Sequence, residues 1–281
     1  MVRFLTILCL LCAPMTAVGA DIVCDRNADN SCATANGSYR IALPETVMPA
    51  SGYPTLVFFH GAGGTGKQTL SNTGMVNTFL DRGYAVIGPD GMRRSATRNG
   101  GGWSFHPDRV AQRDEMAFAR EVISDAAAKF NIDADNVLLS GFSIGGSLVW
   151  YLACQDPTLA RAYAPVAGAF WRPHPVAADC AGPVKMLHTH GWRDQTVPLE
   201  GRPLRNGAIL QGDVFYGLSV MRELNACLKL RADTFDTSGS FWRRKWDTCA
   251  PGTALEFALH TGGHSVPKGW SEMAIDWFEG L

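Results

Sequence analysis

The 281-residue sequence is long enough for one large α/β domain or two small ones, and its 46% hydrophobic and 18% charged content is typical of a globular protein. The formal net charge of −1 gives no electrostatic basis for binding nucleic acid or an anionic membrane surface. We therefore expect no nucleic-acid partner.

The N-terminal residues 1–20 have the pattern of a secretory signal peptide. Arg3 precedes an apolar run at 4–11, and the small residues at 17–20 resemble a cleavage site. An ordinary N-terminal helix is the alternative. The apolar run is too short to span a membrane, and we expect no membrane anchor. We predict a secreted or periplasmic protein. Residues 21–281 are expected to form one catalytic domain, because no repeat or linker divides them, and we also expect a monomer.

Six cysteines follow the predicted signal peptide, and an even number in an exported protein favours disulfides. Six cysteines allow 15 pairings. Pairing neighbours along the chain is the simplest scheme, and it gives Cys24–Cys32, Cys154–Cys180 and Cys227–Cys249. A metal site is the competing interpretation. None of these six cysteines has a C-x-x-C or C-x-x-H spacing, so we expect no metal.

Apolar runs and helical periods alternate along the rest of the chain. In chain order, they predict a strand at 38–43, a strand at 55–59, a helix at 68–81, a strand at 84–88, a long loop at 95–113, a helix at 114–130, a strand at 137–139, a helix at 147–154, a strand at 162–167, a strand at 184–189, a helix at 213–228, strands at 241–246 and 255–259, and a helix at 271–278. This alternation predicts an α/β fold, with a mostly parallel central sheet that carries helices on both faces. In such sheets the active site lies at the carboxyl ends of the strands.

The glycine-rich stretch after the second strand resembles two nucleotide-binding patterns. Gly61-x-Gly63-x-x-Gly66 fits the dinucleotide pattern, and Gly61-x4-Gly66-Lys67 nearly fits the P-loop, but Gln68 stands where a Ser or Thr would hold magnesium. An exported protein would rarely meet these cytosolic nucleotides, so we expect no organic cofactor. The better interpretation is a loop of small residues that points a backbone N–H into a site that stabilises an anion.

The pattern Gly141-x-Ser143-x-Gly145 lies between a predicted strand and a predicted helix. A sharp strand-to-helix turn of this kind exposes the hydroxyl of its central serine above the sheet. Asp194 and His264 follow later predicted strands, which gives the Ser, Asp, His order of α/β-hydrolases. In that arrangement His264 takes the proton of Ser143, and Asp194 orients the imidazole.

The backbone N–H groups of Ala62 and Ile144 are predicted to bind the oxyanion of the tetrahedral intermediate. Asp213 and Glu200 compete with Asp194, but Asp213 better suits the start of a helix and Glu200 lies too far from the strand end. The other six histidines lack the turn context of His264, or precede a glycine where a structural hydrogen bond is expected. Three loop tryptophans either line an acyl pocket or pack the loops onto the domain: Trp103, Trp171 and Trp192.

Four segments carry a family resemblance: His60-Gly61, Gly141-Phe142-Ser143-Ile144-Gly145-Gly146, His190-Gly191-x-x-Asp194-x-x-Val197-Pro198 and Gly263-His264-x-x-Pro267. They resemble the secreted esterase group that contains polyhydroxybutyrate depolymerases and feruloyl or acetylxylan esterases. The resemblance implies an α/β-hydrolase fold, no metal, no organic cofactor, and a bridge like Cys154–Cys180 after the helix that follows the serine. Two departures are that no substrate-binding domain is appended and that Ile144 replaces a polar residue often seen after the nucleophile.

The leading prediction is therefore a secreted serine esterase acting on hydroxyalkanoate esters or oligomers through an acyl-enzyme. The departures favour soluble esters over solid polymer. The alternative is a feruloyl or acetylxylan esterase of plant polysaccharide. An acyltransferase would share the triad and differ in how it excludes water. A catalytically silent binding protein is the alternative of another class, and the intact Ser, Asp and His oppose it.

Overall fold

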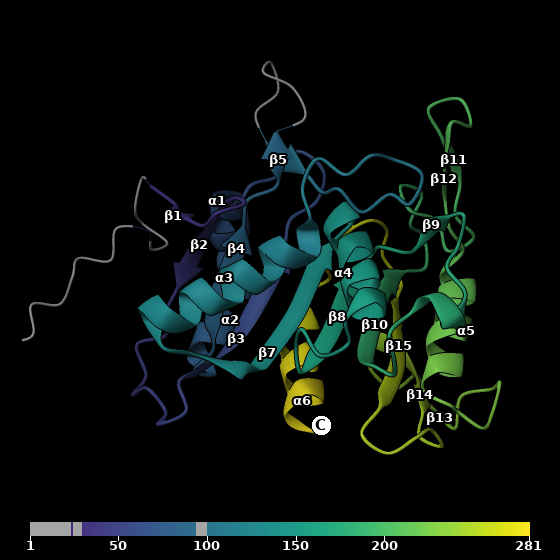
Figure 1. The fold of residues 1–281 in the computed structure, drawn as a ribbon. Coiled ribbons are helices and arrows are strands. Elements are labelled where there is room, and N and C mark those ends of the chain that lie inside the picture. Colours follow the sequence, from purple (N-terminus) through teal and green to yellow (C-terminus); the bar gives the residue numbers. More distant parts are fainter. Residues whose placement is uncertain (1–23, 25–29, 94–99) are drawn as a thin grey trace, which may run out of the picture.

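A computed structural model describes Cys24, residues 30–93 and residues 100–281 (Figure 1). The predicted signal peptide lies outside the described residues. The main sheet has ten strands. Their spatial order is β1 (Cys32–Ala33), β2 (Ser38–Ala42), β4 (Ala85–Pro89), β3 (Tyr53–Phe59), β7 (Ile132–Phe142), β8 (Ala162–Val166), β10 (Lys185–Gly191), β15 (Ala254–His260), β14 (Phe241–Trp246) and β13 (Thr234–Asp236). The central strands from β4 to β15 are parallel, and the outer pairs are antiparallel.

Helices cover both faces of this sheet, as predicted. They are α1 (Gly66–Ser71), α2 (Thr73–Asp81), α3 (Glu115–Phe130), α4 (Ile144–Gln155), α5 (Val214–Leu224) and α6 (Trp270–Glu279). Neighbouring residues of β7 point to opposite faces: Leu139 packs with α3, α4 and α5, whereas Leu138 packs with α2 and α6. Figure 1 shows α3 and α4 on one side of the strands and α6 on the other. The α/β prediction is confirmed.

The differences from the predicted elements have local causes. The helix expected at 68–81 is divided into α1 and α2 at Asn72, whose non-helical backbone ends the first helix and whose side chain caps the second. The strand expected at 137–139 is longer in the structure, since β7 runs from Ile132 to Phe142. Eight elements were not predicted, and each is only two or three residues long: β1, β5 (Met92–Arg93), β6 (Gly101–Gly102), β9 (Trp171–Arg172), the 3₁₀ turn η1 (Ala177–Asp179), β11 (Pro203–Leu204), β12 (Ile209–Gln211) and the edge strand β13.

All three expected disulfides are present: Cys24–Cys32, Cys154–Cys180 and Cys227–Cys249. The second holds the C-terminal end of α4 against the segment between β9 and β10, where the backbone N–H of Ala181 also donates to the carbonyl of Cys154. Among the helices that the structure describes, none combines the length and the apolar character needed to cross a membrane.

Candidate active site

Ser143 lies at the sharp turn between β7 and α4, where its φ of 59° and ψ of −120° place it outside the usual regions for a side-chain-bearing residue. The turn is possible because two glycines allow close backbone contact. A Cβ on Gly145 would lie 2.1 Å from the carbonyl oxygen of Phe59, and one on Gly141 would lie 2.6 Å from the carbonyl carbon of Gly145. The strand-to-helix turn predicted from the glycines is therefore formed, with the serine at its apex.

The structure brings the three predicted residues together in one hydrogen-bonded chain. His264 Nε2 lies 2.9 Å from Ser143 Oγ, and His264 Nδ1 lies 2.7 Å from Asp194 Oδ2. Because Asp194 accepts at Nδ1, Nε2 of a neutral imidazole is free to accept the serine proton. Ser143, Asp194 and His264 follow β7, β10 and β15, so the parallel sheet places them at one edge.

Asp194 is held in its charged form by a rigid turn. Its Oδ1 accepts hydrogen bonds from the backbone N–H groups of Thr196 and Val197, both at 2.9 Å. Burial disfavours the carboxylate, but the hydrogen bonds from His264 and from the Val197 backbone outweigh it and hold the pKa of Asp194 below its usual value. The two backbone hydrogen bonds hold Oδ1 in place, so the carboxylate cannot rotate and Oδ2 is the oxygen that faces His264.

Two buried histidines of β10, His188 and His190, lie behind Asp194, and the sequence did not predict their contact with the site. His190 Nε2 donates to the carbonyl of Val197 at 2.8 Å and lies 3.5 Å from Asp194 Oδ2. Because the Val197 carbonyl can only accept, the proton of His190 is on Nε2, and His190 Nδ1 accepts from His188 Nε2 at 3.0 Å. Burial lowers the pKa of both imidazoles, so both are neutral at pH 7. The sequence does contain a signal for this contact, because His188 and His190 are two residues apart in a strand and their side chains therefore lie on the same face of the sheet.

The loop that follows β3 places Ala62 beside the serine. A Cβ on Gly61 would lie 3.4 Å from Ser143 Cβ, so the loop runs directly past the nucleophile position. Gly63 N–H donates to the Gly101 carbonyl, and Gly101 N–H donates to the Gly64 carbonyl, both at 2.9 Å. Ile144 is the first residue of α4, where backbone N–H groups have no partner within the helix. Ala62 thus follows a residue that lies beside Ser143, and Ile144 follows Ser143 directly; their role as oxyanion donors stays a prediction.

The same loop is unsuited to a nucleotide phosphate. The N-terminus of α1, where the phosphate of a P-loop would lie, already binds a carboxylate: Gly66 N–H donates to Asp90 Oδ1 at 2.7 Å. His60 supports the loop, because its Nε2 accepts from Gly91 N–H at 2.9 Å while Nδ1 contacts the Gly61 carbonyl. Within the described part of the chain, no cluster of three His, Cys, Asp or Glu side chains is arranged to hold a metal ion.

The three predicted tryptophans differ in their positions. Trp103 and Trp171 are buried and line a cavity of about 830 Å³ beside Ala62 and Ile144, here called the larger cavity. The indole N–H of Trp103 donates to the His60 carbonyl at 2.8 Å, and that of Trp171 donates to Ser147 Oγ at 3.1 Å. Both tryptophans therefore have fixed orientations.

Trp192 does not line this cavity and is 58% exposed. Its backbone N–H donates to the carbonyl of His260, which fixes the turn against β15 while the indole extends into solvent. The assignment of Trp192 to a substrate pocket is thus not supported by its position. The competing acids are also accounted for, since Asp213 caps the N-terminus of α5 and Glu200 is exposed.

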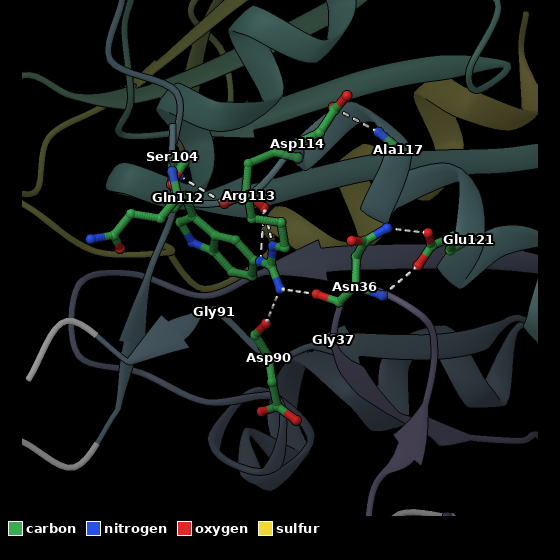
Figure 2. A network of polar contacts seen from close by, with 12 residues as sticks. Asn36, Gly37, Asp90, Gly91, Ser104, Gln112, Arg113, Asp114, Ala117 and Glu121 are labelled. Carbon is green, nitrogen blue, oxygen red and sulfur yellow. Dashed lines mark hydrogen bonds and ion pairs between the residues drawn. The ribbon is translucent and has the colours of Figure 1, made fainter. Parts of the chain in front are cut away.

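One wall of the larger cavity is the loop at 103–112, which a buried ion pair anchors (Figure 2). Arg113 Nη2 lies 2.8 Å from Glu115 Oε2, and the other oxygen of Glu115 accepts from Ser104 N–H at 2.7 Å. Arg113 also donates to the carbonyls of Asn36 and Asp90. Burial raises the pKa of Glu115, although the Arg113 charge opposes the shift. The small sheet of β9, β12 and β11 forms the opposite wall.

Residues 50–208, more than half of the chain, match the family described as phospholipase/carboxylesterase. The chain belongs to this family. The fold agrees with it: the chain superimposes on a crystal structure of acetyl xylan esterase from Aspergillus awamori with a TM-score of 0.61, at 16% identity, over 88% of this chain and 95% of the other. That likeness identifies the α/β-hydrolase fold.

Two curated relatives are also esterases by name. Feruloyl esterase D of Neurospora crassa is 25% identical over 94% of this chain and 89% of its own length. The bifunctional acetylxylan esterase/xylanase XynS20E of Neocallimastix patriciarum is 27% identical over 56% of this chain and 21% of its own length. The chain spans about half or less of the length of several curated relatives that it matches.

Proposed function

We propose that this protein is a serine carboxylesterase, and the observation that carries the proposal is the continuous hydrogen-bonded chain from Ser143 through His264 to Asp194. Ser143 Oγ attacks the ester carbonyl while His264 Nε2 takes its proton, and the backbone N–H groups of Ala62 and Ile144 bind the oxyanion. His264 then gives the proton to the leaving alcohol, and an acyl-enzyme remains. Water, activated by the same imidazole, releases the acid and restores the serine.

The proposed substrates are aromatic acyl esters of plant polysaccharide, of the feruloyl type. The names of the relatives favour this alternative over the hydroxyalkanoate esters that led the sequence-based prediction. The larger cavity supports an aromatic acyl group over acetyl, because its volume of about 830 Å³ far exceeds an acetyl group and Trp103, Phe105 and Trp171 line it. Flat aromatic walls bury a cinnamoyl ring well and gain little from a methyl group.

We also propose that the protein works outside the cytoplasm. The support is the set of three disulfides, since such bonds form and persist in oxidising compartments.

The test compares the purified protein on methyl ferulate, acetylated xylan and soluble 3-hydroxybutyrate oligomers at matched ester concentrations. We expect the highest kcat/KM on methyl ferulate, and no turnover above background for Ser143→Ala on any of them. Hydrolysis of the hydroxybutyrate oligomers at least about tenfold faster than methyl ferulate, about 1.4 kcal/mol of transition-state preference, would reverse the acyl assignment.

A further inference from the structure

A second, smaller cavity of about 400 Å³ lies on the other side of Ala62 from the larger one. Ala62 lines both cavities, but other residues of the two linings belong to the core layers on opposite faces of the sheet. The larger cavity includes Ile144, which packs with the α3, α4 and α5 layer. The smaller cavity includes Phe142 and Val266, which pack with the α2 and α6 layer. Ser143 therefore lies between two separate cavities.

His264 lies on the side of the smaller cavity. Its ring centroid is 4.6 Å from that of Phe142, and Val266 follows it by two residues. The oxygen of the leaving alcohol must come within hydrogen-bond reach of His264 Nε2 to receive its proton. The alcohol part of an ester therefore extends toward the smaller cavity, and the acyl part extends toward the larger one.

We propose that the smaller cavity binds the alcohol part of the ester, and that this alcohol is an uncharged polyol of sugar size. The proposal rests on the esterase function proposed above. It assigns a role to Gln68, which the sequence singled out only as a departure from the P-loop pattern.

The lining of the smaller cavity fits a sugar. Its floor is apolar, with the buried Phe58 and Met75, and its rim carries the exposed polar side chains of Gln68 and Asn72. The C–H faces of a sugar ring suit such a floor, and its hydroxyls suit such a rim.

None of the described residues that line the smaller cavity is Asp, Glu, Lys or Arg. Burial lowers the pKa of His60, which leaves this lining residue neutral at pH 7. A phosphorylated or quaternary ammonium alcohol would find no opposite charge in this lining, whereas a neutral sugar needs none.

Gln68 is the best position for a test because its side chain is exposed and its amide has no partner among the described residues. We would prepare Gln68→Ala and Gln68→Trp, with Gln112→Ala as the matched control. Gln112 is also exposed, but it lines the larger cavity. The kcat/KM of each variant is measured on methyl ferulate and on feruloyl arabinose. These esters share one acyl-enzyme and differ only in the alcohol.

The proposal predicts that Gln68→Ala lowers kcat/KM for feruloyl arabinose about three- to tenfold, the effect of one neutral hydrogen bond. Gln68→Trp should lower it further by filling the cavity, and both variants should retain methyl ferulate turnover. Gln112→Ala should leave the ratio between the two esters unchanged. A ratio that stays constant in both Gln68 variants, or that Gln112→Ala shifts equally, would overturn the assignment of the alcohol site.

The design separates this proposal from the proposed acyl specificity. If the wild-type protein hydrolyses neither feruloyl ester, the acyl assignment is wrong, and the same variants are compared on ethyl acetate and an acetylated xylose. A selective loss on the sugar ester would still support the alcohol site. Equal effects on both acetates, or no hydrolysis of any ester by the wild-type protein, would overturn it.

Discussion

Replacing Asp194 by asparagine should reverse the proton arrangement of His264 without disturbing the fold. Asp194 Oδ1 accepts two backbone hydrogen bonds, from Thr196 and Val197, so the carbonyl oxygen of an asparagine must take that place. Its NH₂ group then faces His264 Nδ1, which lies 2.7 Å from the present Oδ2. A donor there requires Nδ1 to accept, and the proton moves to Nε2. With that proton on Nε2, the imidazole can no longer take the proton of Ser143.

The expected loss in kcat is on the order of 10⁴-fold, or about 5.4 kcal/mol, as expected for a wrong tautomer in a Ser-His-Asp triad. Steady-state hydrolysis of p-nitrophenyl acetate measures it. Asp213→Asn is the matched control, because Asp213 also accepts backbone N–H bonds, but at the start of α5. Asp194→Asn activity within about tenfold of the wild-type value, in a folded protein, would refute the reasoning.

Three further predictions concern stability. The two buried histidines of β10 have lowered folded-state pKa values, so the unfolded chain binds more protons below pH 6.5. The free energy of unfolding should therefore fall as pH drops from 6.5 to 5, by up to about 1.4 kcal/mol per pH unit for each histidine. Urea titrations with a flat response over this range would contradict it. Glu115→Gln leaves the Arg113 charge buried without its ion-pair partner and should cost about 3–5 kcal/mol, and a change below about 1 kcal/mol by urea unfolding would show that the pair is not needed. The double substitution Cys227→Ser with Cys249→Ser opens a loop closed at a sequence separation of 22 and should cost about 3 kcal/mol, with an unchanged melting temperature as the contrary result.

The part of the site that local sequence determines was predictable. Gly141 and Gly145 flank Ser143 because a Cβ at either position would collide with backbone, and this requirement is visible in the sequence. Asp194 and His264 could be placed because each follows a buried strand, and parallel strands end at one edge. The sequence motif around Ser143 and the close backbone packing at the turn depend on the same two glycines, so the prediction and the structure agree there.

The features that depend on distant segments could not be predicted. Trp171 and Trp192 were both predicted to lie in loops, yet only Trp171 turns inward, because Ser147 on α4 accepts its indole N–H. Likewise, the smaller cavity arises where the loop after β3 meets Phe142 and Val266. The residue pattern within one segment gives no information about a cavity whose walls come from three separate segments. Neither cavity was therefore visible in the sequence.

The role of Ser143 as the nucleophile is tested most directly by the hydrolysis of p-nitrophenyl butyrate by Ser143→Ala. Ser140→Ala provides the matched control, because Ser140 lies three residues earlier, in β7, and its hydroxyl donates to the carbonyl of Ala164. We expect a loss in kcat on the order of 10⁴- to 10⁶-fold for Ser143→Ala, with the thermal unfolding temperature preserved, and near wild-type activity for Ser140→Ala. Undiminished turnover by Ser143→Ala would contradict it.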